Sequence, residues 1–257
     1  MKYIFKALFF AAAILINIGC TTLLVADFED DTIGSFPDTN LPSDPSGDSV
    51  FLYNALGPGR TAPIMDCVKV DEIDGSKVML LNSNARPASG TFCDANAWFI
   101  SKQTSSEGPY SVTFELTIHS FVSASLSFGF IHRVPLVELE FVSGPSSDLR
   151  SGSVKLNIES TSGKIEAAEG SYRPFDKIRG IITFTPEEET YAVYLSGTGA
   201  SLSHDGSYAH TGDLSGSRRL TMAVGAAAYD RNDPRTRGPG TIIVDNVIIG
   251  ENDQSED

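Results

Sequence analysis

SVTFELTIH, residues 111–119, decides the fold class of this chain. Its valine, phenylalanine, leucine and isoleucine stand at every second position, between serine, threonine and glutamate. A period of two is typical of an antiparallel strand with one face in a core and the other in water. ITFT (182–185) and YAVYL (191–195) repeat the alternation. The sequence therefore predicts an all-β body.

Short runs of the same character follow one another along most of the chain. Turn-forming pairs such as Asp74-Gly75 and Ser162-Gly163 separate them and predict tight hairpins. Past the first twenty residues there is no amphipathic helical pattern, so the many short strands predict a sandwich or a barrel. The expected strands cover residues 23–28, 49–54, 66–70, 77–81, 97–101, 110–119, 123–133, 136–142, 153–159, 164–169, 178–185, 190–195, 218–224 and 241–249.

The first twenty residues, MKYIFKALFFAAAILINIGC, form a separate unit. Two lysines precede an apolar run of ten residues, Ala7–Ile16, whereas a membrane-spanning helix needs about 20. The run has the length of a signal-peptide core, and we expect it to be helical. The pair Gly19-Cys20 resembles the end of the lipobox of bacterial lipoproteins, which implies a lipid on the Cys20 thiol. Ordinary signal cleavage beside an unmodified cysteine is the alternative.

This resemblance implies a chain that is lipid-anchored in a bacterial cell envelope. Thr21 follows the cysteine, as in lipoproteins passed on to an outer membrane. Membrane lipid, held through Cys20, is the first expected partner. We expect a signal peptide over residues 1–19, one β domain over residues 20–250 and a disordered acidic tail over residues 251–257. The polar span Pro37–Gly47 is expected to be a loop within the domain.

The two remaining cysteines, Cys67 and Cys93, form an even pair once Cys20 is set aside. Export would place them in an oxidising compartment, where disulfides persist. A bridge between them would stabilise the folded chain by about 3 kcal/mol. We predict this disulfide, and two buried free thiols are the alternative.

The charge of the chain excludes one class of partner. The formal net charge is −14, and without the two leader lysines 17 basic side chains stand against 33 acidic ones. Such a surface repels the phosphates of nucleic acids and of anionic lipid head groups. Nucleic acid is therefore not an expected partner, whereas neutral ligands, cations and basic partners remain open.

Three segments together resemble a known family of sandwiches. The start VADFEDDTIGSFP (25–37), the end TIIVDNVIIG (241–250) and the hairpin between residues 178 and 195 are similar to strands of secreted jelly-roll domains. The hairpin resembles that of concanavalin A-like (laminin G-like) lectins and glucanases. The resemblance implies a two-sheet antiparallel jelly roll with adjacent first and last strands. It also implies carbohydrate as the commonest ligand class.

The segment LVELEF (136–141) resembles the EIDIEF strand of glucanases in this superfamily. The resemblance places the nucleophile at Leu136, an assisting acid at Glu138 and the acid/base at Glu140. Alternation puts Glu138 and Glu140 on one face, about 7 Å apart along the strand. Leu136 carries no carboxylate, so a retaining mechanism lacks its covalent step. We predict no catalytic residues and name both glutamates as ligand-binding candidates, with a plain solvated strand face as the alternative.

Aromatic residues provide further candidates for a glycan site, because sugar rings stack on aromatic faces. Trp98 could be such a platform or could pack in the core. Tyr229, Asp230 and Arg231 lie in a long polar loop, and such loops often bind ligands. A mobile connector is the alternative for that loop.

Metal and histidine chemistry have weaker signals. The four histidines lack zinc-site spacing, and His204 and His210 are expected in solvated loops. Calcium prefers clustered carboxylates, and Asp27, Glu29 and Asp245 would converge if the first and last strands pair. An acidic solvated edge is the alternative, and no other cofactor is expected.

We therefore predict a non-enzymatic envelope protein that binds a glycan, such as a polysaccharide, or another envelope component. A divergent glycoside hydrolase or polysaccharide lyase is the second hypothesis, and in a lyase Tyr172 or Tyr208 could donate the proton. The third hypothesis is a structural surface lipoprotein without a small ligand.

Overall fold

The computed structural model describes residues 20–37, 50–53, 68–82, 95–104, 109–119, 124–130, 136–143, 151–209, 216–224 and 240–252. These ranges contain β-strands and one short 3-10 turn, η1 (Pro186–Glu188), and none of them is α-helical. The strands are β1 (Cys20–Ala26), β2 (Val50–Tyr53), β3 (Val68–Ile73), β4 (Ser76–Asn82), β5 (Ala95–Thr104), β6 (Tyr110–Ile118), β7 (Ala124–Phe130), β8 (Val137–Ser143), β9 (Gly152–Ile158), β10 (Ile165–Tyr172), β11 (Lys177–Thr185), β12 (Thr190–Gly197), β13 (Ser201–Ser207), β14 (Gly216–Val224) and β15 (Thr241–Asn252).

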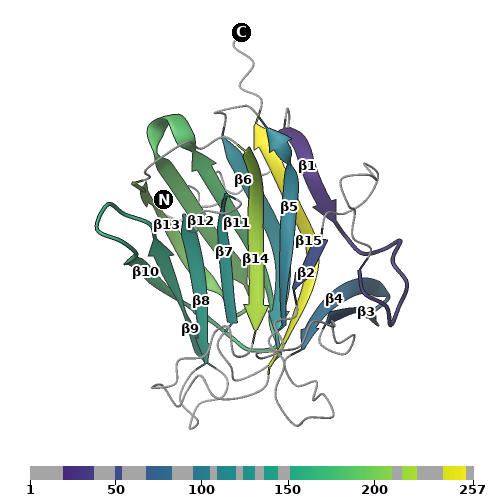
Figure 1. Cartoon of the computed structure of the whole chain (residues 1–257). Helices are drawn as coiled ribbons and strands as arrows, with labels where there is room; N and C mark the ends of the chain where they lie inside the picture. Colours follow the sequence, from purple (N-terminus) through teal and green to yellow (C-terminus); the bar gives the residue numbers. More distant parts are fainter. Residues whose placement is uncertain are drawn as a thin grey trace, which may run out of the picture.

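The strands form two layers that are joined along one side. The first layer has the order β2-β5-β14-β7-β8-β9, and the second runs β13-β12-β11-β6-β15, continued by β1 and by the β4-β3 hairpin. β10 connects the layers, because it pairs with β9 along its length and with β13 through Ser171 and Ser201. Figure 1 is seen with the first layer in front. The fold is an all-β, two-sheet antiparallel sandwich, as predicted.

The core lies between the two layers and follows the predicted alternation. On β6 every second side chain, from Tyr110 to Ile118, is almost completely buried, and the intervening ones are half-buried. Phe128 of β7 stacks on Phe184 of β11 with 5.2 Å between ring centroids, which links the two layers. β1 pairs with β15, so the expected adjacency of the first and last strands is confirmed.

Each predicted strand has a counterpart, but the prediction missed β13. Its sequence SLSHDGS was interpreted as loop because it is rich in serine, aspartate and glycine. In the structure only Leu202 among its residues is buried. β13 forms because β12 offers a complete ladder, from Thr190 opposite Ser207 to Ser196 opposite Ser201. His204 is therefore a strand residue and not a loop residue. β15 also continues to Asn252, two residues into the expected acidic tail.

The turn predictions are only partly correct. Asp74 and Gly75 both have positive φ, 53° and 83°, as a two-residue hairpin turn requires. Ser162 and Gly163 instead belong to a longer connection, in which the backbone N–H groups of Ser160 and Gly163 each donate to the other residue's carbonyl.

Some expectations fall outside the described residues. These are the leader, nearly all of the Pro37–Gly47 loop, and the end of the chain after Asn252. In the part of the chain that the structure describes, no helix is long and apolar enough to cross a membrane.

Candidate functional site

Glu138 and Glu140 share the outer face of β8, as predicted. Val137, Leu139 and Phe141 are fully buried on the inner face, and the two glutamates alternate with them as half-buried residues. Leu136, which the resemblance placed at the nucleophile position, does not lie on this face, because it is only 2% exposed and lies in the core. Its N–H donates to the carbonyl of Phe128, and its own carbonyl accepts from the N–H of Glu159. The alternation therefore begins at Val137, and the nucleophile position of the glucanase pattern is absent from this face.

Lys164, just before β10, contacts both glutamates. Its Nζ forms a close ion pair with Glu138 and lies 3.8 Å from Oε1 of Glu140. Burial lowers the pKa of Lys164 although two carboxylates face it. A retaining hydrolase needs its two carboxyls on either side of an open space for the sugar bond. Here the ammonium group of Lys164 lies beside both carboxylates.

The strand register places Glu138 in a row that crosses the first layer. Thr221 of β14 pairs with Trp98 of β5 on one side and with Ser127 of β7 on the other. Ser127 pairs with Glu138, and Glu138 with Asn157 of β9. We call this set the Trp98–Asn157 row. Neighbouring strands are about 4.8 Å apart, so three steps from Trp98 to Glu138 span about 14 Å.

Trp98 faces outward within this row. Its neighbours Ala97 and Phe99 are fully buried, whereas Trp98 is half-buried on the opposite face of β5. Trp98 therefore lies outside the core between the two layers. An adjacent row contains Glu140 opposite Lys155, and Nζ of Lys155 lies 3.0 Å from Oε2 of Glu166.

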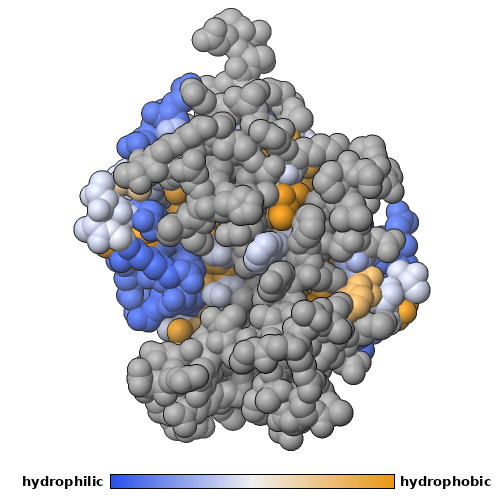
Figure 2. Space-filling model, viewed as in Figure 1, coloured by the Kyte–Doolittle hydropathy of each residue, from blue (hydrophilic) through white to orange (hydrophobic). Residues whose placement is uncertain are grey.

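Apart from Trp98, the described side chains named on this outer surface are polar. Figure 2 shows hydrophilic surface gathered where β8, β9 and β10 lie in Figure 1. The sequence had pointed to the glutamates but not to Ser127, Asn157, Lys155 and Lys164. The only signal for Ser127, Lys155 and Asn157 is alternation within β7 and β9, and alternation does not say which strands are neighbours.

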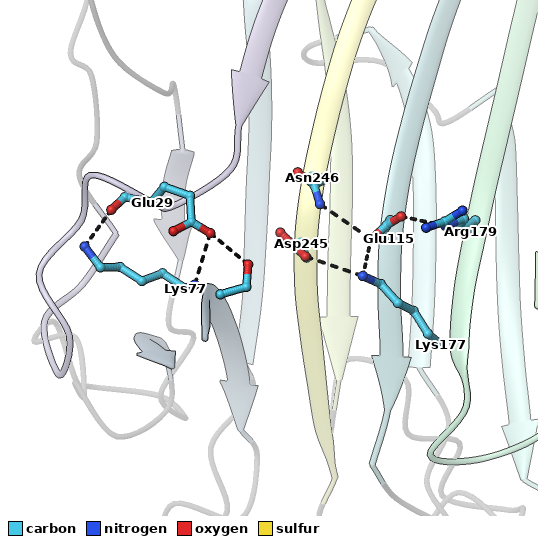
Figure 3. A network of polar contacts seen from close by, with 8 residues as sticks. Glu29, Lys77, Glu115, Lys177, Arg179, Asp245 and Asn246 are labelled. Carbon is cyan, nitrogen blue, oxygen red and sulfur yellow. Dashed lines mark hydrogen bonds and ion pairs between the residues drawn. The ribbon is translucent and has the colours of Figure 1, made fainter. Parts of the chain in front are cut away.

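The first two calcium candidates, Asp27 and Glu29, make local contacts, and Figure 3 shows those of Glu29. Oδ1 of Asp27 accepts from the N–H of Glu29 at 3.2 Å. Oε1 of Glu29 accepts from Oγ of Ser76 at 2.8 Å and from the N–H of Lys77 at 3.2 Å. Nζ of Lys77 donates to the carbonyls of Glu29 and Asp31. These groups fasten the segment after β1 to the β3–β4 hairpin.

The third candidate, Asp245, belongs to a different network on the outer face of the second layer. Its Oδ2 lies 3.6 Å from Nζ of Lys177, which also forms a close ion pair with Glu115 (Figure 3). Nε of Arg179 lies 2.6 Å from Oε1 of Glu115, and Nδ2 of Asn246 donates to Oε2 at 3.5 Å. Among the described residues no three metal-ligating side chains come together, so Asp27, Glu29 and Asp245 do not form the expected cluster.

The surroundings shift the pKa values of Glu115 and Asp245 in opposite directions. Burial alone would raise the pKa of Glu115, but Lys177 and Arg179 hold that pKa below its ordinary value of 4.5. Burial raises the pKa of Asp245 above 3.8, and Lys177 only partly opposes this effect.

We expect the Glu115→Gln variant to lose less stability than the wild type as the pH falls. A carboxyl with a lowered folded-state pKa stabilises the protein above its unfolded pKa, and that contribution is lost as the pH falls through the folded pKa. The contribution of Asp245 to stability changes with pH in the opposite direction, because folding favours its protonated form. The Asp245→Asn variant should therefore lose stability more steeply than the wild type as the pH falls. Urea unfolding between neutral pH and about pH 3 measures both slopes. Identical slopes in the two variants would contradict this assignment, and Glu72→Gln on the exposed face of β3 is the control.

Other predicted residues lie outside the described ranges or in the core. Tyr229, Asp230, Arg231, Cys67 and Cys93 fall outside the described residues, so the loop site and the disulfide stay predictions. The backbone of Cys20 begins β1 and pairs with Asn252.

Tyr172 and Tyr208 do not fit the role of proton donors in a lyase. Both are almost completely buried. The Tyr172 ring packs edge-on against Phe141, and the Tyr208 ring packs edge-on against Phe184. Burial raises the pKa of Tyr172 far above its ordinary value. Their rings belong to the core and not to an open site.

Comparison with known proteins supports the fold alone. No family model matches the chain, and no curated protein matches its sequence. Among solved structures, the alginate lyase Aly36B in complex with an alginate trisaccharide has a TM-score of 0.55, at 10% identity over 90% of this chain and 98% of that one. A GH131 β-glucanase catalytic domain from Podospora anserina has a TM-score of 0.54, at 11% identity over 89% and 95%. The lectin UEA-II complexed with galactose has a TM-score of 0.50, at 12% identity over 90% and 100%.

These structures place the sandwich among jelly-roll folds, as the resemblance implied. Their names describe a lectin, a glycoside hydrolase and a polysaccharide lyase, all of which bind or cleave carbohydrate. The sequence identities are low, so the likeness does not distinguish a binding protein from an enzyme.

Proposed function

We propose that this protein binds a neutral glycan on the outer face of its first layer, along the Trp98–Asn157 row. The observation that carries the proposal is the register, which aligns an outward tryptophan with a hydroxyl, a carboxylate and an amide on adjacent strands. The glycan-related structures with the same fold support this ligand class.

Each described member of the row suits one part of a sugar. An indole ring offers an apolar face to the C–H groups of a pyranose. Glu138 can accept hydrogen bonds from two hydroxyls, while Asn157 and Ser127 both donate and accept. The net charge of −14 makes a neutral glycan a better partner than a polyanionic one.

Binding is favoured over catalysis by two features of β8. Leu136 lies in the core where the glucanase pattern needs a nucleophile. Lys164 lies beside both Glu138 and Glu140, so the carboxylates already have a cationic partner. The carbohydrate-cleaving structures with this fold keep a divergent hydrolase or lyase as the alternative.

We expect Trp98→Ala and Glu138→Gln to weaken glycan binding about tenfold each. Loss of a stacking contact or of a charge-assisted hydrogen bond costs about 1.4 kcal/mol, which is a tenfold change in affinity. The measurement is binding of the full chain to immobilised neutral and acidic polysaccharides, followed by affinities for those retained. Glu72→Gln makes the same charge change on β3 and should bind like the wild type.

Failure of the wild type to bind any glycan would overturn the proposal. Turnover of a polysaccharide that both Glu138→Gln and Glu140→Gln abolish would favour the enzymatic alternative. Equal binding by the wild type and Trp98→Ala would remove the row from the site.

The lipid anchor at Cys20 is the second part of the proposal. If the thiol carries the lipid, the domain has no spacer from the membrane, because β1 begins at this residue. Cys20→Ser should move the protein from the membrane fraction to the soluble fraction and remove the mass of the acyl chains. Membrane retention of Cys20→Ser, measured by fractionation and mass spectrometry, would contradict the anchor.

A further inference from the structure

The turn between β10 and β11 places an aromatic residue where turn geometry favours glycine. In Arg173-Pro174-Phe175-Asp176 the N–H of Asp176 donates to the carbonyl of Arg173 at 3.3 Å, and Phe175 has φ of 71°. Proline in the second position and positive φ in the third are the pattern of a type II turn, whose third residue is usually glycine or asparagine. A bulky residue with positive φ is a conformational outlier.

The other non-glycine residues with positive φ in the described ranges have local explanations. Asp74 and Asn246 are residue types that tolerate this conformation, and Glu189 terminates η1. Phe28 is 1% exposed, so burial of its ring compensates for the strain. Phe175 is 55% exposed, and core packing therefore does not explain its conformation. Strain of this kind often marks a functional position.

The ring of Phe175 is held in place despite its exposure. The Phe175 N–H donates to the carbonyl of Ile118 at 3.0 Å, and its ring lies 5.1 Å from that of His119 at an angle of 58°. The N–H of His119 in turn donates to the carbonyl of Thr241 at 2.7 Å. The two rings thus form a tilted pair on a hydrogen-bonded backbone, with the half-exposed side chain of Arg173 in the same turn.

We propose that Phe175 and His119 form a second sugar-binding contact, which stacks one ring of the same glycan. This inference rests on the proposed function for its ligand class. Burial lowers the pKa of His119, which favours the neutral ring, and a neutral imidazole offers one donor and one acceptor beside the apolar Phe175 face.

The contact lies at the end of the sandwich away from Cys20. Ile118 ends β6, whereas Tyr110 begins it and pairs with Glu251, next to the β1–β15 end that contains Cys20. The eight steps along β6 correspond to about 26 Å. A polysaccharide long enough to reach both contacts would gain more apparent affinity from the second one than a short oligosaccharide.

The test uses the full chain on immobilised β-glucan, galactan, xylan and mannan. Phe175→Gly should bind the retained polysaccharide about tenfold more weakly, while its thermal stability equals or exceeds that of the wild type because glycine relaxes the turn. Phe175→Trp keeps a ring and should retain binding. Ile33→Ala removes a comparably exposed apolar side chain from another turn and should change nothing.

The outcomes separate this inference from the proposed function. Wild-type affinity in Phe175→Gly, with loss of binding in Trp98→Ala, would overturn the second contact and leave the first site standing. Absence of binding by the wild type would overturn both. If Phe175→Gly does not fold, Phe175→Asn, which also tolerates positive φ, decides the question by the same affinities.

Discussion

Phe128→Ala is expected to lower the free energy of unfolding by about 3–5 kcal/mol. The ring of Phe128 is 2% exposed and stacks on Phe184, which belongs to the opposite layer. Its removal leaves a cavity between two sheets whose backbones are fixed by their ladders, so the core can close only partly. Denaturation with urea or guanidinium measures the change as a lower midpoint with an unchanged slope.

Ser127→Ala is the matched control, because Ser127 precedes Phe128 on β7 but faces outward. Its effect should stay within about 0.5 kcal/mol. A double-mutant cycle with Phe184→Leu should give a coupling energy of about 0.5–1.5 kcal/mol for the ring pair. If Phe128→Ala were as mild as Ser127→Ala, the packing of the two layers described above would be incorrect.

The fold could be predicted from the sequence because alternation is a local property. In β6 each inward residue is apolar and each outward residue is polar, so seven or more residues indicate both the strand and its buried face. β13 was missed because SLSHDGS lacks this contrast between apolar and polar positions. It forms a strand because it pairs with β12 along its whole length. Local pattern fails where a strand depends on its neighbour.

The candidate site could be predicted only in part, for a related reason. Alternation was sufficient to place Glu138 and Glu140 on one face of β8. It could not show that Trp98 is in the same row as Glu138, because β14, more than a hundred residues after β5 in the chain, lies between β5 and β7. Strand order is a non-local property, and the sequence contains no direct signal for it.

The sequence raised a calcium site only as a weak possibility, and among the described residues its candidate carboxylates have other partners. Glu29 and Asp245 were expected to converge when β1 and β15 paired, and those strands do pair. Lys77 and Lys177 nevertheless engage them separately, on different parts of the second layer. A buried carboxylate needs a compensating partner, and Lys177 supplies it for Asp245. The exposed Glu29 carboxylate instead accepts from the Ser76 hydroxyl and the Lys77 backbone N–H.

Gly180→Ala should lower the free energy of unfolding by about 1–3 kcal/mol. Gly180 of β11 is directly opposite Phe114 of β6, and a β-carbon at this position would overlap the Phe114 ring. That ring is 1% exposed and cannot move into solvent. Alanine in a strand would otherwise be favoured over glycine by about 0.5–1 kcal/mol, so a destabilising result shows that the steric overlap outweighs the gain in backbone entropy.

A smaller partner should reverse this effect in part. Phe114→Leu alone leaves a cavity, but combined with Gly180→Ala it makes room for the new methyl group. We expect the double variant to be more stable than the sum of the two single changes predicts, by about 0.5–3 kcal/mol, because the residues are in contact. Chemical denaturation of the four proteins measures this coupling. Strict additivity would mean that the ring does not occupy the space over Gly180, whereas coupling would show that the missing side chain of Gly180 is what allows β6 and β11 to pair around a buried phenylalanine.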